Sequence, residues 1–458
     1  MKLTSLITDL FKRYLPTPFT IAVLLTLLTM VLALVFTESS SDKNHFLEIL
    51  TYWESGIWNN DLLVFGYQMM LVLVLGHVLV LSTPVSRLIL RLVKLVKNGA
   101  NAALLVALST MLVAFFNWGL GLIFGAILAR KVGEYAQEHN IPINYPLIGA
   151  AGYAGLMVWH GGISGSAPLK VAESGHLQGL MKNVLGTEDL QGLPRAIASS
   201  STVFSGSNLI IFSAVLLVIS FLAYRLGKTA PATSFGLNTY RFESEEKKAS
   251  GGADRLDHSK FFAFGFGALI LIAFAIQYSG MLRTMNITPN MLNFFMFGMA
   301  ILMHGSIKSF LSAVENAIGD TSGILIQFPM YFGIMGIMAG SGMVNGISDF
   351  FVSVSTTTTM PIFTFFSAGL VNVFVPSGGG QWAVQGPLVL ESALRLNVPL
   401  PKAVMALAYG DQITNMLQPF WALPLLGITK LKAKQILPYT LIFMFAGGLI
   451  YLLGLVFL

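Results

Sequence analysis

Long apolar runs constrain this chain more than any other feature of its sequence. Runs of 16 to 24 mostly uncharged residues recur along it, and a helix needs about 20 such residues to cross roughly 30 Å of hydrocarbon. We therefore expect an all-α integral membrane protein with about nine transmembrane helices, over residues 18–36, 62–82, 146–169, 203–224, 261–279, 289–304, 321–344, 402–425 and 435–457.

The composition supports this class and excludes others. Hydrophobic residues make up 55% of the chain and charged residues 10%, with a mean hydropathy of +0.73, whereas soluble domains carry about 25% charged residues. The net charge of +6 comes from Lys and Arg beside the apolar runs, which favours topology determinants over a nucleic-acid site. Cysteine is absent, which excludes disulfides and Cys-based metal sites.

Two apolar stretches are interrupted by polar and Gly-rich segments. Residues 101–129 contain NWGLG from Asn117, and residues 361–397 contain NVFVPSGGGQW from Asn372. We expect each to form a re-entrant hairpin of two half-helices. Irregular backbone at membrane depth is tolerated only where protein or a watery cavity covers it, so the two tips are candidate walls of a site.

The distribution of charge predicts an orientation. Lys2, Lys12 and Arg13 indicate a cytoplasmic N-terminus, and the acidic loop 37–61 then lies outside. The amphipathic stretch 84–98 lies on the cytoplasmic face, and the C-terminus is periplasmic. The main exceptions are three basic residues in a predicted external loop, Lys170, Lys182 and Arg195.

A hydrophilic cytoplasmic linker, 225–260, divides the chain. We expect a first half-repeat, 1–224, with hairpin 101–129, and a second half-repeat, 261–458, with hairpin 361–397. The order span, hairpin, broken span, span recurs in opposite orientation. A shift of 256 positions aligns Tyr153 with Tyr409. This is the pattern of an inverted repeat.

The Gly-rich tip favours an anion. A run of glycines lets backbone approach a ligand, and the N-terminus of the following half-helix presents unpaired N–H groups, although a flexible turn or a close packing site would also explain the run. We predict substrate-binding residues at both tips and both broken spans: Asn117, Gly119, Ser164, Ser166, Asn372, Ser377, Gly378, Gly379, Gly380, Gln381 and Asn415.

The two broken spans are candidate sites for a coupling ion. Asp411 is the sole carboxylate deep in its span, and an unpaired charge at mid-bilayer costs at least ~2.5 kcal/mol. We predict that Asp411, Thr414 and His160 bind or relay Na⁺ or H⁺, although Asp411 could instead be a structurally paired carboxylate or lie nearer the surface, and His160 a hydrogen-bonded structural residue. No metal site, cofactor or enzyme signature is expected, because the chain lacks H-E-x-x-H, a P-loop and a G-x-S-x-G elbow.

Four motifs resemble the bacterial short-chain fatty acid transporter family: NWGLGLIFGA, HGGISGSAPL, VPSGGGQWAVQGP and AYGDQITNMLQPFWALP. The resemblance covers essentially the whole chain. It implies an elevator-type symporter in the bacterial inner membrane that carries acetoacetate- or butyrate-like monocarboxylates, and it suggests a homodimer. Gln381 departs from the pattern, because we expect His there in some relatives. The alternative is a cation/proton antiporter with no organic substrate.

Overall fold

The computed structural model describes residues 18–39, 44–238, 252, 254–284, 286–374 and 377–458, and every regular element within these ranges is a helix. Within these ranges, six helices are long and apolar enough to cross a membrane: α4 (Asn60–Leu81), α6 (Gly99–Phe116), α12 (Gly206–Thr229), α14 (Lys260–Gln277), α18 (Ser322–Gly340) and α24 (Ala433–Phe457). A seventh span results if α16 (Pro289–His304) and α17 (Ile307–Ala317), bent by 120°, are counted together. The structure therefore has the helices of a multi-pass membrane protein.

Five of these six helices coincide with predicted spans, and the sixth is the first arm of a predicted hairpin. The other predicted spans are short or interrupted. The described apolar part of α2 (Pro18–Phe36) covers only Ala22–Phe36, and the spans 146–169 and 402–425 are broken. Nine spans therefore stays a prediction.

The first broken span begins with α8 (Tyr145–Tyr153) and the short turn η1 (Ala154–Met157). Residues 158–165 form no helix, and α9 (Ser166–Val171) follows. The second consists of α22 (Leu400–Thr414), η4 (Asn415–Leu417) and α23 (Pro419–Thr429). Three glycines interrupt the first helix, and a proline, which lacks an N–H donor, restarts the second.

Both predicted hairpins have two helical arms. In the first, α6 and α7 (Trp118–Glu138) meet at Asn117; in the second, α20 (Met360–Phe374) precedes α21 (Gly378–Arg395), and Val375 and Pro376 lie outside the described residues. The prediction of half-helices is wrong for the first hairpin: α6 has 18 residues and α7 has 21, which is about 27–32 Å of helix. Whether either hairpin re-enters the membrane stays a prediction.

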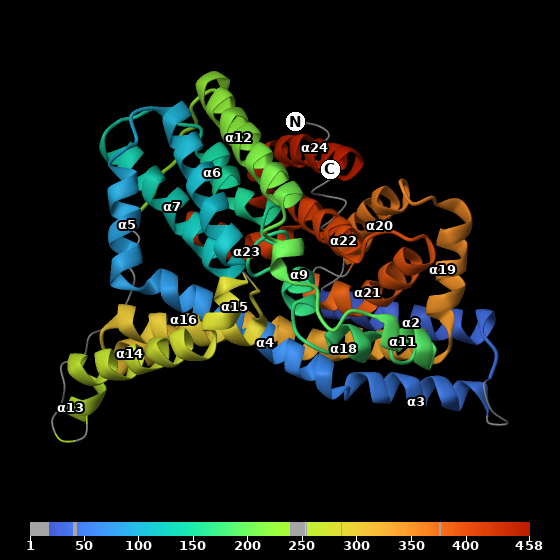
Figure 1. Ribbon diagram of the computed structural model, residues 1–458. Coiled ribbons are helices and arrows are strands. Elements are labelled where there is room, and N and C mark those ends of the chain that lie inside the picture. Colours follow the sequence, from blue (N-terminus) through green and yellow to red (C-terminus); the bar gives the residue numbers. More distant parts are fainter. Residues whose placement is uncertain (1–17, 40–43, 239–251, 253, 285, 375–376) are drawn as a thin grey trace.

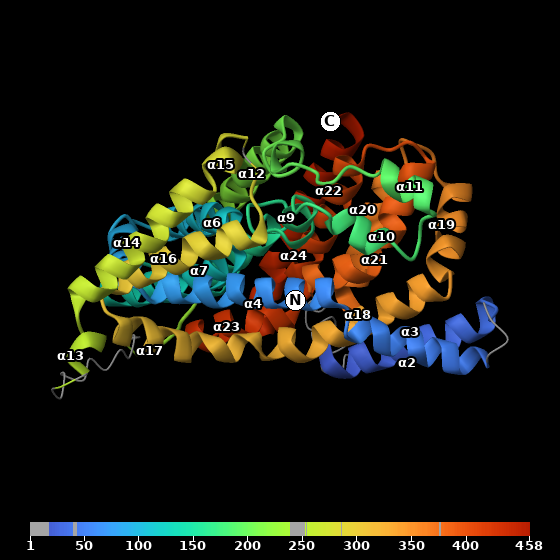
Figure 2. The same cartoon turned by 60° about the horizontal axis from the view of Figure 1, so that its bottom comes forward.

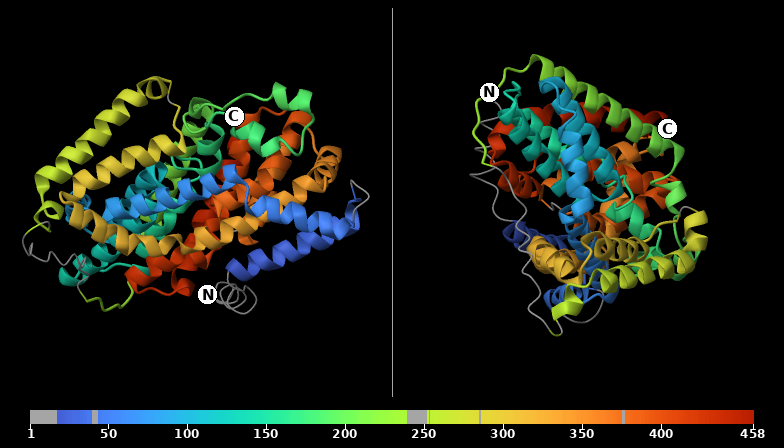
Figure 3. Two further views of the ribbon diagram at one scale, coloured as in Figure 1. Left: turned by 90° about the horizontal axis from the view of Figure 1, so that it is seen from below. Right: turned by 90° about the vertical axis from the view of Figure 1, so that its left-hand side faces the viewer.

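The helices form two groups. Along the lower side of Figure 1 lie α2, α3 (His45–Ile57), α4, α14 and α16, whereas α6, α7, α12, α22 and α24 form the upper part. Figure 2 shows α14 and α15 (Ser279–Arg283) at one end of the molecule and α2 and α3 at the other. Seen from below in Figure 3, α4 crosses the lower group beside α16 and α18, which it contacts.

Helix α3 corrects the prediction that residues 37–61 form an external loop. It packs on α18, where a Cβ on Gly56 would lie 2.5 Å from the backbone oxygen of Phe332. Only glycine permits this approach of the two backbones. The segment was missed because its 13 residues are too few to span a membrane and include two glutamates.

The amphipathic stretch 84–98 contains α5 (Thr83–Val93), which buries Ile89 and Val93 and exposes Arg87 and Arg91. The first part of the predicted linker packs on the rest of the chain, because Asn144 donates a hydrogen bond to the backbone oxygen of Pro231. Residues 239–251 and 253 of the linker lie outside the described residues. The remaining elements are α10 (His176–Met181), α11 (Thr187–Gly192), η2 (Ser199–Ser201), α13 (Asp254–Asp257), η3 (Ile318–Thr321) and α19 (Met343–Val354).

Candidate functional site

Both hairpins and both broken helices line one internal cavity. Its walls are apolar except for Ser166, Ser377 and Asn415, and the full lining is Met69, Trp118, Leu156, Trp159, Ser166, Ile324, Phe328, Ser377, Gly378, Gly379, Asn415 and Trp421. The cavity is small in this conformation. About 20 Å³ is open to the centre of a water molecule, and one bound water needs about 10–15 Å³ on that measure. Any larger ligand therefore requires the lining residues to move.

Three tryptophans meet at this cavity. The ring centroid of Trp118 lies 5.7 Å from that of Trp159 and 5.3 Å from that of Trp421. In the part of the chain that the structure describes, the indole N–H groups of Trp118 and Trp159 are buried without a hydrogen-bond partner. None of the three is among the predicted substrate-binding residues, although Trp118 belongs to the predicted tip NWGLG and each stands within a few positions of a helix break.

His160 and Asp411 form a buried pair directly behind the cavity. Both residues have no exposed surface, and Nδ1 of His160 bonds to Oδ2 of Asp411. On the other edge of the ring, Nε2 accepts the backbone N–H of Ala167 at 3.0 Å. Because an acceptor nitrogen carries no proton, the proton of the neutral imidazole lies on Nδ1 and is donated to the carboxylate.

Neighbouring amides fix the orientation of this pair. The Gln412 side-chain oxygen accepts the backbone N–H groups of His160 and Gly161 at 2.9 and 3.0 Å. Asn208 donates to the Gly161 carbonyl at 2.9 Å and accepts the Tyr409 hydroxyl at 2.8 Å. Polar side chains therefore replace the helical hydrogen bonds that the break at 158–165 removes.

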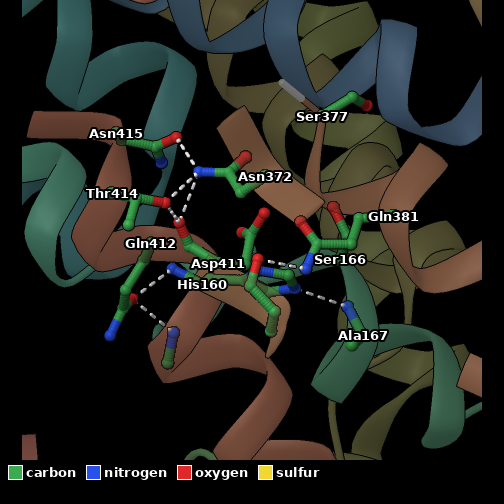
Figure 4. Close-up of polar contacts among 12 residues, drawn as sticks. His160, Ser166, Ala167, Asn372, Ser377, Gln381, Asp411, Gln412, Thr414 and Asn415 are labelled. Atoms are coloured by element: carbon green, nitrogen blue, oxygen red, sulfur yellow. Dashed lines mark hydrogen bonds and ion pairs between the residues drawn. The ribbon is translucent and has the colours of Figure 1, made fainter. Parts of the chain in front are cut away.

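A second polar cluster joins the Gly-rich hairpin to the break of α22. The amide nitrogen of Asn372 lies 2.6 Å from the Asp411 carbonyl, 2.9 Å from the Thr414 hydroxyl and 2.9 Å from the Asn415 side-chain oxygen. Figure 4 shows these three oxygens converging on the Asn372 amide. Tyr153 connects the two breaks, since its hydroxyl donates to the Asn415 carbonyl at 3.0 Å.

This region has more acceptors than donors. Within the described residues, four buried side-chain oxygens in or beside these clusters have no hydrogen-bond partner: Asn372 Oδ1, Gln381 Oε1, Asp411 Oδ1 and Gln418 Oε1. A buried polar atom without a partner costs about 1–3 kcal/mol. Surplus oxygens of this kind are suited to a cation, an added proton or ordered water.

The two hairpin tips use the same helix cap. Asn117 Oδ1 accepts the N–H of Leu120 at 2.7 Å at the start of α7, and Ser377 Oγ accepts the N–H of Gly380 at 3.2 Å at the start of α21. Such caps satisfy N–H groups that a helix start leaves unpaired. The Asn117 amide also approaches the Val72 carbonyl at 3.3 Å, so it holds the tip on α4.

The glycine run packs against aromatic rings. A Cβ on Gly378 would lie 2.5 Å from Trp159, one on Gly379 2.9 Å from Phe328, and one on Gly380 2.5 Å from Tyr331. Close packing therefore requires these glycines. Gly378 and Gly379 also line the cavity, so close packing and cavity formation occur at the same tip.

The predicted site residues fall into three places. Ser166, Ser377, Gly378, Gly379 and Asn415 line the cavity. Behind it lie His160, Asp411, Asn372, Thr414 and Gln381, where Gln381 donates to the Ala368 carbonyl at 2.9 Å. At the first tip, Gly119 packs on Leu73, and Ser164 accepts the Trp118 backbone N–H at 2.9 Å. Asn117, Gly119 and Ser164 are thus engaged in contacts within the tip and with α4.

An all-helical membrane chain with two interrupted helices around a buried polar site is a multi-pass membrane transporter. Sequence comparison identifies the transporter family. The profile described as "Short chain fatty acid transporter" matches residues 1–458, and the chain belongs to that family. Its family assignment is that of a transporter, not of an enzyme.

Two curated relatives, each named "Putative short-chain fatty acid transporter", are similar over their full lengths. The protein of Escherichia coli strain K12 is 36% identical over 99% of both chains, and that of Haemophilus influenzae is 34% identical over 100% of this chain and 99% of the relative.

Two solved structures share the fold. One is Neisseria gonorrhoeae MtrF, whose title describes a class of antimetabolite efflux pumps; it has a TM-score of 0.59 at 14% identity and covers 98% of this chain and 97% of its own. The other is the Alcanivorax borkumensis YdaH transporter, with a TM-score of 0.57 at 15% identity and coverage of 96% and 98%. At these identities the likeness concerns the fold alone.

Proposed function

We propose that the chain is a secondary active transporter for short-chain monocarboxylates of the acetoacetate and butyrate type, coupled to a cation or proton. The observation that carries the proposal is the composition of the cavity. Its mostly apolar walls suit a short hydrocarbon tail, and its few polar side chains stand where helices start or break: Ser377 at the start of α21, Ser166 at the start of α9 and Asn415 in η4. A short fatty acid has the same two parts.

The substrate's carboxylate can be bound by hydrogen-bond donors other than Lys and Arg. Neither residue type is among the lining residues described. The N–H groups of Gly378 and Gly379 belong to the first turn of α21, where helices leave N–H groups unpaired and favour anions. The unpartnered indole N–H groups of Trp118 and Trp159 are further donors. The substrate's negative charge is offset by the coupling ion.

The coupling ion binds at the surplus oxygens behind the cavity. Asp411, Thr414, Asn415 and Asn372 supply carboxylate, hydroxyl, amide and carbonyl oxygens, which are the ligands of hard cations, while Asp411 could alternatively take a proton. This cluster adjoins the glycine tip, because a Cβ on Gly378 would lie 2.9 Å from the His160 ring. The proposed ion site and the proposed substrate site are therefore in contact at Gly378 and His160. Such contact permits binding at one site to affect the other.

The alternative is a cation/proton antiporter with no organic substrate. It would use the Asp411 cluster and leave the cavity without a role. Tryptophan fluorescence separates the two, because three of the six tryptophans line the cavity. Butyrate and acetoacetate should change the emission of the purified protein saturably, whereas butanol and butanamide should not. No saturable change with any short acid, at any Na⁺ concentration or pH, would favour the antiporter.

An elevator motion within an inverted repeat is the mechanism we propose. In support, α7 packs on α4 and α8, and its repeat mate α21 packs on α18 and α22. The group around α7 and α22 would carry the site past the group around α4 and α16, in a homodimer of the inner membrane with a cytoplasmic N-terminus and a periplasmic C-terminus.

A reversible cross-link tests this motion. Ser166 on α9 and Met69 on α4 lie 3.6 Å apart between side-chain oxygen and sulfur, and the chain has no native cysteine. Oxidation of the double variant Met69→Cys/Ser166→Cys should stop transport, and reduction should restore it, while each single variant should be insensitive to oxidant. Undiminished transport by fully cross-linked protein would contradict the elevator.

A further inference from the structure

A buried ammonium group close to the cavity has no part in the function described so far. Lys170 of α9 is 4% exposed, although it belongs to a segment predicted as an external loop. Its Nζ donates to the Gln68 side-chain oxygen at 3.1 Å and pairs with the Glu173 carboxylate. Burying an ammonium group is costly unless it is paired, so this arrangement requires an anion at Nζ.

Lys170 lies close to the cavity without lining it. It follows Ser166, a lining residue, by one helical turn of α9. Its Nζ is 5.5 Å from the centre of the Phe65 ring, and that ring lies 6.4 Å from Phe328, another lining residue. The Phe65 ring thus connects the surroundings of Lys170 to a ring that lines the cavity.

The carboxylate that is paired with Lys170, that of Glu173, reaches the surface. The Glu173 side chain is 28% exposed. Ser174 and Gly175, the next two residues, line a surface hollow together with Arg195, whose side chain is exposed. Burial, with the Lys170 ammonium nearby, lowers the pKa of His176 to about 3, so that imidazole is neutral. Glu173 is therefore the member of the pair that solvent reaches, and it stands next in sequence to a surface hollow that contains a second basic residue.

We infer that Lys170 is a docking site for the carboxylate of the transported acid on the outer side of the protein. In the absence of substrate, the Glu173 carboxylate takes that place on Nζ. An incoming carboxylate replaces that of Glu173 on Nζ, and Glu173 turns to solvent. The number of buried charges is unchanged by this exchange, so the added desolvation cost is low. A released substrate then enters the cavity past Phe65 and Phe328. This inference rests on the proposed carboxylate transport.

Kinetics from each side of the membrane test the inference. Uptake of labelled butyrate is measured in right-side-out and inside-out vesicles containing the full chain. Lys170→Gln should raise the KM on the outer face at least about tenfold, the equivalent of one hydrogen bond to a charged group, and leave the inner KM unchanged. Lys170→Arg should restore most of the affinity. Lys182→Gln, at an exposed lysine of the same loop, is the matched control.

Glu173→Gln removes the competing carboxylate and should lower the outer KM. The Glu173→Gln variant also tests the inference if Lys170→Gln fails to fold. A lowered KM on the outer face supports the docking site, and an unchanged KM overturns it. A purely structural role of Lys170 would reduce the maximal rate equally from both faces, with KM unchanged, and would overturn the inference as well. Wild-type protein without saturable carboxylate uptake overturns the proposed function itself, and this inference with it.

Discussion

Asp411 accepts a hydrogen bond from Nδ1 of His160, a residue 251 positions earlier in the chain. The other ring nitrogen accepts the N–H of Ala167, so protonating His160 would cost that hydrogen bond. Asp411 has a second oxygen, Oδ1, without a partner among the described residues. We propose that a proton or cation entering the site binds to this oxygen of Asp411, and that His160 orients the carboxylate.

The first prediction concerns Asp411→Asn. The amide keeps the shape and can still accept from Nδ1 of His160, but it takes up no proton and lacks the negative charge that offsets a bound cation. Gradient-driven accumulation of butyrate should fall at least about tenfold, since a hydrogen bond to a charged group is worth about 1.5–3 kcal/mol. Substrate exchange across the membrane without a gradient should persist. Asp189→Asn, at an exposed carboxylate, is the control, and full accumulation by Asp411→Asn would remove the coupling role.

His160→Ala should destabilise the fold. It leaves the Asp411 carboxylate and the Ala167 N–H buried without their partners, and breaking a buried pair costs about 3–5 kcal/mol. We expect a lower free energy of unfolding in detergent titrations. His139→Ala, at an exposed position, should stay within about 0.5 kcal/mol of wild type. Equal stability of the two variants would show that the pair contributes little.

The indole N–H groups are predicted to bind the carboxylate. Trp118→Phe and Trp159→Phe keep an aromatic ring and lose the donor, so each should weaken butyrate binding by roughly tenfold, about the worth of one hydrogen bond to an anion. Trp58→Phe, at a side chain that is 63% exposed, should bind normally. Isothermal titration of the purified variants measures the effect. Unchanged affinity in both cavity variants would assign the carboxylate to other donors.

Gly378→Ala should close the cavity. The added Cβ would lie 2.5 Å from the Trp159 ring, and overpacking of this kind typically costs about 1–3 kcal/mol. We expect reduced stability and no measurable butyrate binding. At Gly427, inside α23, a Cβ would meet nothing within 4 Å, so Gly427→Ala should bind as wild type does. Normal binding by Gly378→Ala would show that the tip moves away from Trp159 before the substrate enters.

The helix breaks could be predicted from the sequence because glycine, proline and polar residues in apolar runs have a local cause. The segments NWGLG and SGGGQW each contain a helix start, at Trp118 and at Gly378, and the Gln418–Pro419 step begins α23. The contacts between the breaks have no local signal. Nothing in the sequence pairs His160 with Asp411, or brings Trp118 onto Trp421, because such contacts depend on how distant helices pack.

For two residue types the structure adds contacts that the sequence does not reveal. Asn117 was assigned to the substrate because it is polar at membrane depth, yet its side chain caps α7 and holds the tip on α4. The three cavity tryptophans are absent from the predicted substrate-binding residues, although Trp118 belongs to the predicted tip NWGLG. Burial and hydrogen-bond partners separate these roles, and both require the folded structure.

Uptake of labelled butyrate and acetoacetate into proteoliposomes tests the central claim most directly. Purified protein is reconstituted, and Na⁺ and pH gradients are imposed separately, with protein-free liposomes as the blank. The account predicts saturable uptake that one of the two gradients drives above equilibrium, and loss of that accumulation in Asp411→Asn. Folded protein that takes up no short-chain acid under either gradient, yet exchanges Na⁺ for H⁺, would contradict it.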